Sequence, residues 1–192
     1  SSRVGAVTVW RRIDHGRPAS WNQEIIQLWI NTPAAHKMDQ PAYFPLTAEE
    51  APTYATEDSK VKVMLFSGEI LGLKGPIPSH TKVNAATVYA KKEGKLYVEL
   101  PANHNTLLYL LDGMIKIDGF GIVEGLNAIL FNHDGEGVSF EAVEDTRALL
   151  LSGEPLNEKV TSHGPFVMNT QTEIMEAMRD YQMGKMGVLI EE

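Results

Sequence analysis

Short β-prone runs separated by glycine-containing turns fill the middle of this chain and constrain its fold most strongly. Eight such runs occur, at residues 61–66, 85–89, 95–100, 106–111, 114–117, 127–131, 137–140 and 148–151. Turn signals such as Ser67-Gly68, Glu93-Gly94 and Asp112-Gly113 stand between them. Many short strands at this spacing are typical of an all-β sandwich or barrel. We therefore predict one jelly roll of about eight strands in two packed sheets.

The C-terminal segment carries the pattern of the one helix that we predict. Thr170 and Glu173 have the spacing of a capping box, in which the threonine accepts from the helix start and the glutamate reaches back. Gly184 supplies the stop signal. The apolar residues between these ends fall on one helical stripe: Ile174, Ala177, Met178 and Tyr181.

Residues ahead of the jelly roll have a different texture. Two β-prone runs, at 4–13 and 25–30, are followed by a proline-containing connection at 34–58 with little periodicity. Such a connection favours a segment laid along a surface or between domains. The chain begins at Ser1 without a methionine, so we expect a processed product or a fragment.

Composition excludes several classes of function. The chain has no cysteine, which rules out disulfides, cysteine-ligated zinc or iron–sulfur sites and a cysteine nucleophile. Its net charge of −8 does not suit a nucleic-acid partner, because phosphate binding depends on Lys and Arg. No apolar run reaches the ~20 residues that span a bilayer. We expect a cytoplasmic protein without membrane or nucleic-acid partners.

Two sequence blocks resemble the pirin family, whose members are bicupins with two jelly-roll β-barrels in one chain. They are QLWINTPAAHKM at 27–38, and SGEPL at 152–156 continuing into HGPFVMNT at 163–170. The resemblance implies an all-β cupin jelly-roll barrel (a double-stranded β-helix) with a C-terminal α-helix. It assigns residues 25–60 to the inter-domain region, 61–160 to the C-terminal cupin and 161–192 to the HGPFVMNT block and helix. Residues 1–24 are left as a strand or loop of unclear origin.

The resemblance also implies where the chemistry of such proteins lies. Pirins carry iron or another divalent metal in the N-terminal cupin, on an HPHRG-like His-x-His motif and a later His-x-Glu, and the family activity is quercetinase-like dioxygenation. Nothing in residues 1–24 matches these motifs. The part that is present resembles the domain without the metal, so no catalytic residue is assigned and no cofactor is expected in this chain.

The cupin that is present lacks a complete ligand set of its own. The first cupin motif would fall at 101–112, which holds His104 as its one histidine and Leu107 where the glutamate ligand is expected. The second would fall near 133–140, where His133 precedes the glycines. We expect no metal site, with His104 and His133 as weak candidate ligands. His80 is interpreted as a hydrogen-bonded loop histidine, and His163 as a residue whose ring bonds the backbone ahead of the helix.

These patterns leave three hypotheses for function, and whether the protein is an enzyme stays open. The first is a non-catalytic cupin that acts as a structural or protein-interaction module, either as a homodimer or with a partner protein or domain. The apolar surface for such contacts is expected at Trp10, Trp21, Trp29 and Met186. The alternative is part of a metal-dependent dioxygenase whose metal-bearing N-terminal cupin is absent from this chain. A third is a small-ligand cupin with Tyr89, Tyr97 and Tyr109 in its interior.

Overall fold

Two compact units make up this chain. The computed structural model describes residues 7–12, 23–40 and 42–186, and side chains from Ile26 onward. One unit spans residues 40–156, and the other combines residues 1–39 with residues 157–192. The longer continuous unit contains both large sheets. None of the helices in the described residues is long and apolar enough to cross a bilayer.

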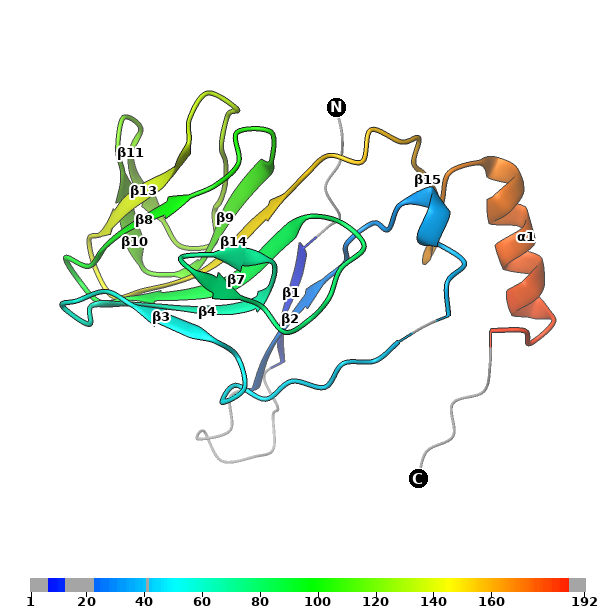
Figure 1. The fold of residues 1–192 in the computed structure, drawn as a ribbon, viewed down its shortest axis with the longest axis horizontal. Helices are drawn as coiled ribbons and strands as arrows, with labels where there is room; N and C mark the ends of the chain where they lie inside the picture. Colours follow the sequence, from blue (N-terminus) through cyan, green and yellow to red (C-terminus); the bar gives the residue numbers. More distant parts are fainter. Residues whose placement is uncertain (1–6, 13–22, 41, 187–192) are drawn as a thin grey trace. The chain divides into compact units, whose positions relative to one another are not determined.

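The unit of residues 40–156 is a jelly roll of two antiparallel sheets (Figure 1). The six-stranded sheet has the order β12-β9-β14-β7-β4-β3. Its strands are β3 (Thr53–Ala55), β4 (Val61–Ser67), β7 (Val83–Ala90), β9 (Asn105–Asp112), β12 (Ala128–Leu130) and β14 (Thr146–Gly153). The four-stranded sheet has the order β11-β10-β13-β8. Its strands are β8 (Lys95–Glu99), β10 (Met114–Ile117), β11 (Gly121–Glu124) and β13 (Gly137–Ala142).

The core between the two sheets follows directly from alternation in the sequence. In β8, Leu96 and Val98 are buried while the residues beside them are exposed, because successive side chains of a strand point to opposite faces. The same alternation on β4, β9 and β13 delivers aliphatic side chains to one continuous cluster. Its fully buried members include Val63, Leu65, Leu108, Leu110, Ile115 and Leu150. This interior is filled with side chains, as is usual in a small jelly roll.

Strand β14 is apolar on both of its faces. Leu150 belongs to the core cluster, whereas Leu149 and Leu151 point to the opposite face and are also buried. A strand buried on both faces has a continuous apolar run in place of alternation, which explains the sequence Ala-Leu-Leu-Leu at 148–151.

The other unit contains the N-terminal hairpin and the C-terminal helix. Its elements are β1 (Val7–Arg12), β2 (Gln23–Leu28), the 3-10 turn η1 (Ala34–His36), β15 (Thr161–His163), β16 (Phe166–Met168) and α1 (Gln171–Gln182). The capping box of Thr170 and Glu173 is present in full at the start of α1. Ile174 is fully buried, and the ring of Phe166 meets Tyr181 edge-on with centroids 6.0 Å apart.

The structure confirms the all-β class, the cupin jelly roll and the C-terminal helix. Each of the eight predicted runs overlaps a strand, although the strand pairing in the described residues forms separate sheets and not one closed barrel. Strands that we did not predict are β3, β11, the hairpin of β5 (Glu69–Ile70) with β6 (Leu73–Lys74), and the hairpin of β15 with β16. Glycines in and beside β11, and at the turn between β15 and β16, interrupt the alternation of apolar and polar residues that would indicate a strand.

Candidate functional site at the mouth of the jelly roll

A row of three buried polar residues lies across one end of the six-stranded sheet. Ser152 of β14 pairs in register with Asn84 of β7 on one side and with Thr106 of β9 on the other. The next row inward consists of Ala86, Leu150 and Leu108, which belong to the core. The three polar residues are exposed by only 5–7%. The apolar core therefore ends in polar groups at this edge.

The side-chain amide of Asn84 has one orientation that satisfies both of its hydrogen bonds. Its Oδ1 accepts from the Glu69 backbone amide at 2.8 Å, so its Nδ2 must be the donor to the Ser152 hydroxyl at 2.9 Å. The Ser152 hydroxyl also makes a hydrogen bond with Nδ1 of His104, 3.3 Å away. Either atom can be the donor in this bond, because the hydroxyl has a proton and a second lone pair and the imidazole has two tautomers.

The surroundings of His104 favour the neutral form of its ring. The residue is 6% exposed. Burial lowers the pKa of the His104 imidazole because loss of solvent disfavours the charged ring; the Glu154 carboxylate opposes this effect, and the Lys82 ammonium adds to it. Glu154 also accepts a hydrogen bond from the Asn103 amide at 3.1 Å. These contacts fasten the loop between β8 and β9 to the end of β14.

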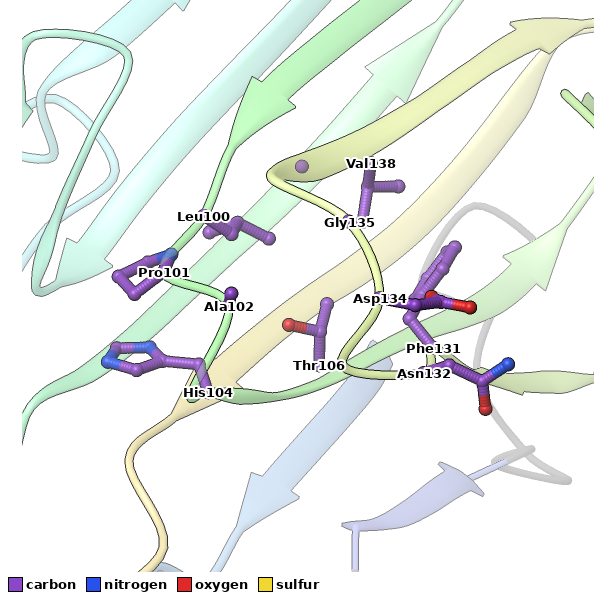
Figure 2. Close-up of a pocket in the computed structure, with 11 residues that line it drawn as sticks. Leu100, Pro101, Ala102, His104, Thr106, Phe131, Asn132, Asp134, Gly135 and Val138 are labelled. Atoms are coloured by element: carbon purple, nitrogen blue, oxygen red, sulfur yellow. The ribbon is translucent and has the colours of Figure 1, made fainter.

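A small cavity opens beside this polar row. Its volume is about 80 Å³, and its walls come from the β8–β9 loop, the end of β12, the following loop and the start of β13. The lining residues are Leu100, Pro101, Ala102, His104, Thr106, Phe131, Asn132, Asp134, Gly135, Gly137 and Val138. In Figure 2 the Thr106 side chain stands between the loop of Ala102 and the loop of Asp134, while the His104 ring points away from Thr106.

The two candidate metal ligands have separate protein partners. His104 uses Nδ1 for Ser152, and His133 uses Nε2 for the side-chain oxygen of Asn105 at 2.9 Å. Among residues 42–156 that the structure describes, no three imidazole or carboxylate side chains gather closely enough to share an ion. The donor set of the jelly roll does not fit an iron-type centre, which needs several N/O ligands around one point.

The other residues singled out from the sequence lie away from this mouth. His80 is exposed on the loop before β7. His163 is exposed in β15, and the ring-to-backbone bonds expected of it are not found among the described residues. The prediction of tyrosines in the interior is wrong, because Tyr89 and Tyr97 are 44% and 57% exposed and Tyr109 lies on the face of β9 opposite the core.

The two sequence blocks that carry the pirin resemblance meet in the smaller unit. Glu158 accepts from the backbone amide of Ala34 at 2.8 Å and from the Asn169 side chain at 3.1 Å. Lys37 donates to Asn31 at 2.6 Å. Burial lowers the pKa of the Lys37 ammonium, against the opposing effect of the Glu158 and Glu173 carboxylates. The blocks thus form a structural junction of charged and amide groups.

Comparison with known proteins decides the family. The model of the pirin C-terminal cupin domain matches residues 83–187, more than half of the chain. The chain belongs to the pirin family. A pirin-like protein of Solanum lycopersicum is 33% identical over 189 residues, covering 94% of this chain and 63% of that protein. A pirin-like protein of Caulobacter vibrioides is 34% identical over 161 residues, covering 83% of this chain and 57% of its own length.

A solved structure of a pirin relative has the same fold. The crystal structure named quercetin 2,3-dioxygenase from Acinetobacter baumannii superposes with a TM-score of 0.83 at 34% identity. It covers 87% of this pirin chain, and the chain spans 58% of that structure. The chain therefore corresponds to somewhat more than half of the relatives that it matches.

Sequence reasoning missed the residues that make the mouth of this pirin chain. Asn84, Thr106 and Ser152 each lie two residues before or after an inward-facing aliphatic residue on the same strand face. The available signal was one polar residue on the buried face of each of three strands. The sequence alone does not show that these three residues are neighbours, because strand pairing is set by contacts distant in sequence.

Proposed function

We propose that this chain is a non-catalytic cupin of a pirin-family protein and acts as a structural or protein-interaction module. The observation that carries the proposal is the mouth of the jelly roll. Its two histidines are hydrogen-bonded to Ser152 and Asn105, and the cavity of about 80 Å³ is roughly half the ~150 Å³ that holds one benzene ring in an engineered protein cavity. A flavonol contains larger ring systems than this space accepts.

The second candidate is a part of a metal-dependent dioxygenase whose metal-bearing cupin lies outside this chain. It is favoured by the likeness to the Acinetobacter baumannii structure named quercetin 2,3-dioxygenase, of which this chain spans 58%. In that case iron or another divalent metal would belong to the larger protein.

Elemental analysis of the purified chain separates these two functions. We expect substoichiometric iron, nickel, copper and manganese in the wild type, with no change in the His104→Ala and His133→Ala variants. One metal ion per chain that is lost in either variant would refute the non-catalytic proposal. The absence of metal from the chain stays a prediction until this measurement is made.

The partner in this proposal binds at exposed apolar side chains. Four of them follow one another along the free edges of the two sheets, at β11 and β12: Phe120, Ile122, Leu126 and Leu130, each at least 61% exposed. Trp29 and Met186 are also half exposed, while the side chains of Trp10 and Trp21 lie outside the described residues. Apolar patches of this kind are typical of protein interfaces.

We propose a homodimer through the β11 edge, working in the cytoplasm. Light scattering after size exclusion tests the dimer: the wild type should have twice the chain mass of 21.2 kDa, and Ile122→Lys should be a monomer. Tyr97→Lys is the matched control, because Tyr97 is similarly exposed but lies on the opposite edge strand β8. A monomeric wild type would contradict the dimer, and cell fractionation tests the location.

A further inference from the structure

Thr106 is a largely buried residue whose hydroxyl has no hydrogen-bond partner among the described residues. The residue is 7% exposed, and its side chain makes no hydrogen bond with any described residue. Its neighbours in the polar row differ, since Asn84 and Ser152 are both hydrogen-bonded. The hydroxyl of Thr87 is sealed in the protein without a partner, whereas that of Thr106 borders the cavity. A polar group on a largely buried side chain normally has a partner, and the cavity is the space beside Thr106 that a partner can enter.

The walls of the cavity combine apolar side chains with polar groups, and the polar share is slightly larger. Leu100, Pro101, Phe131 and Val138 present carbon surface around the Thr106 hydroxyl. Figure 2 shows the Thr106 side chain between two loops, with Leu100 and Val138 above it in the view. Apolar side chains beside a few well-placed polar groups are the usual lining of a small-molecule site. Its volume of about 80 Å³ admits a short aliphatic chain and excludes an aromatic ring.

The charge around the cavity selects against anions. None of its lining residues is Lys or Arg, and Asp134 contributes a carboxylate at its rim. The loop after β12 can supply backbone N–H groups as hydrogen-bond donors. No described residue accepts a hydrogen bond from the backbone amides of residues 132–136. Neutral oxygen atoms of a ligand can accept from these amides, while its hydroxyl proton can go to Thr106.

We propose that the mouth of the jelly roll is a binding site for a short neutral alcohol or diol. The Thr106 hydroxyl exchanges a hydrogen bond with the ligand hydroxyl, and the carbon chain packs against Leu100, Phe131 and Val138. The Asn84–Ser152–His104 chain of hydrogen bonds keeps the β8–β9 wall in place. This site goes beyond the role of an interaction module and does not depend on it, because it needs neither a metal nor a partner protein.

Titration of the isotope-labelled full chain with propane-1,2-diol, followed by NMR, tests the proposal. We expect saturable shifts of the Thr106, Gly135 and Val138 signals with a Kd on the order of millimolar, as for other ligands of this size. The Thr106→Val variant keeps the shape but removes the hydroxyl, so its Kd should rise about three- to tenfold, the range for one lost hydrogen bond.

Two further variants and two further probes make the result decisive. Thr87→Val removes an unpartnered hydroxyl outside the cavity and should leave the Kd unchanged. Ala102→Leu fills the entrance and should abolish binding even where Thr106→Val is poorly folded. Phenol and acetate should not bind, because of size and charge respectively. Shifts without saturation, equal affinity in Thr106→Val, or tighter binding of phenol or acetate would overturn the site.

Discussion

Nδ1 of His104 lies 3.3 Å from the hydroxyl oxygen of Ser152, which itself accepts a hydrogen bond from Asn84. This contact joins the loop after β8 to the end of β14 through a nearly buried histidine. The amide of Asn84 is oriented by the Glu69 backbone. Asn84, Ser152 and His104 thus form one chain of hydrogen bonds across this end of the sheet.

Acidification should weaken the fold through His104. The unfolded chain protonates this ring near the ordinary pKa of 6.5, whereas burial lowers the pKa in the folded chain. Below pH 6.5 the unfolded state therefore binds more protons than the folded state. The contribution of the neutral His104 ring to the free energy of unfolding is full above pH 6.5, and it is lost as the pH falls through the pKa of the folded chain. Urea denaturation between pH 7.5 and pH 5 should show a shallower decline for His104→Gln than for the wild type. Thr106→Val, which removes a neighbouring hydroxyl and no titratable group, should keep the wild-type decline; equal slopes in all three would contradict the prediction.

Asp112 and Arg147 form an ion pair that a backbone hydrogen bond reinforces. The Arg147 backbone amide and Nε donate to the two carboxylate oxygens at 3.1 and 2.6 Å, where the register of β9 and β14 shifts. We expect Asp112→Ala to lower the free energy of unfolding by about 1 kcal/mol, since the pair is bidentate but only partly buried. Chemical denaturation measures the change. Glu69→Ala removes an ion pair with Lys74 whose side chains are 70% and 82% exposed, and a loss as large as that of Asp112→Ala would argue against this explanation.

Gly113 connects β9 to β10 in a conformation that only glycine fits. Its φ is +85°, and a Cβ there would lie 2.4 Å from the Asp145 carbonyl oxygen. We expect Gly113→Ala to cost roughly 3 kcal/mol or more, from backbone strain and the clash with main-chain atoms together. The control is Gly119→Ala, which has φ +76° and no atom within 4 Å of the added Cβ. In thermal unfolding, Gly119→Ala should lower the free energy of unfolding by about 1 kcal/mol, from backbone strain alone. Similar losses for both variants would exclude the clash as a cause of the loss in Gly113→Ala.

The helix α1 depends on its capping box. The Thr170 hydroxyl accepts from the Glu173 amide at 3.3 Å, and the Glu173 carboxylate accepts from the Thr170 amide at 2.7 Å. Thr170→Ala should reduce the protection of the α1 amides by about 1 kcal/mol in native-state hydrogen exchange. Thr172→Ala, at an exposed position inside the first turn, should leave protection unchanged or slightly higher because alanine favours helix. Loss of protection in both variants would point away from capping.

The sequence alone determined the fold class, the eight main strand positions, the C-terminal helix and the family, because these depend on local alternation, turn residues and contiguous blocks. Runs such as 95–100 specify a half-buried strand whatever their partners are. Only the tertiary structure decided the candidate site. Asn84, Thr106 and Ser152 are separated by up to 68 residues and become neighbours through the pairing of β7, β14 and β9. Which polar groups then find a partner depends on that pairing, and Thr106 is the member of the row whose side chain has none among the described residues.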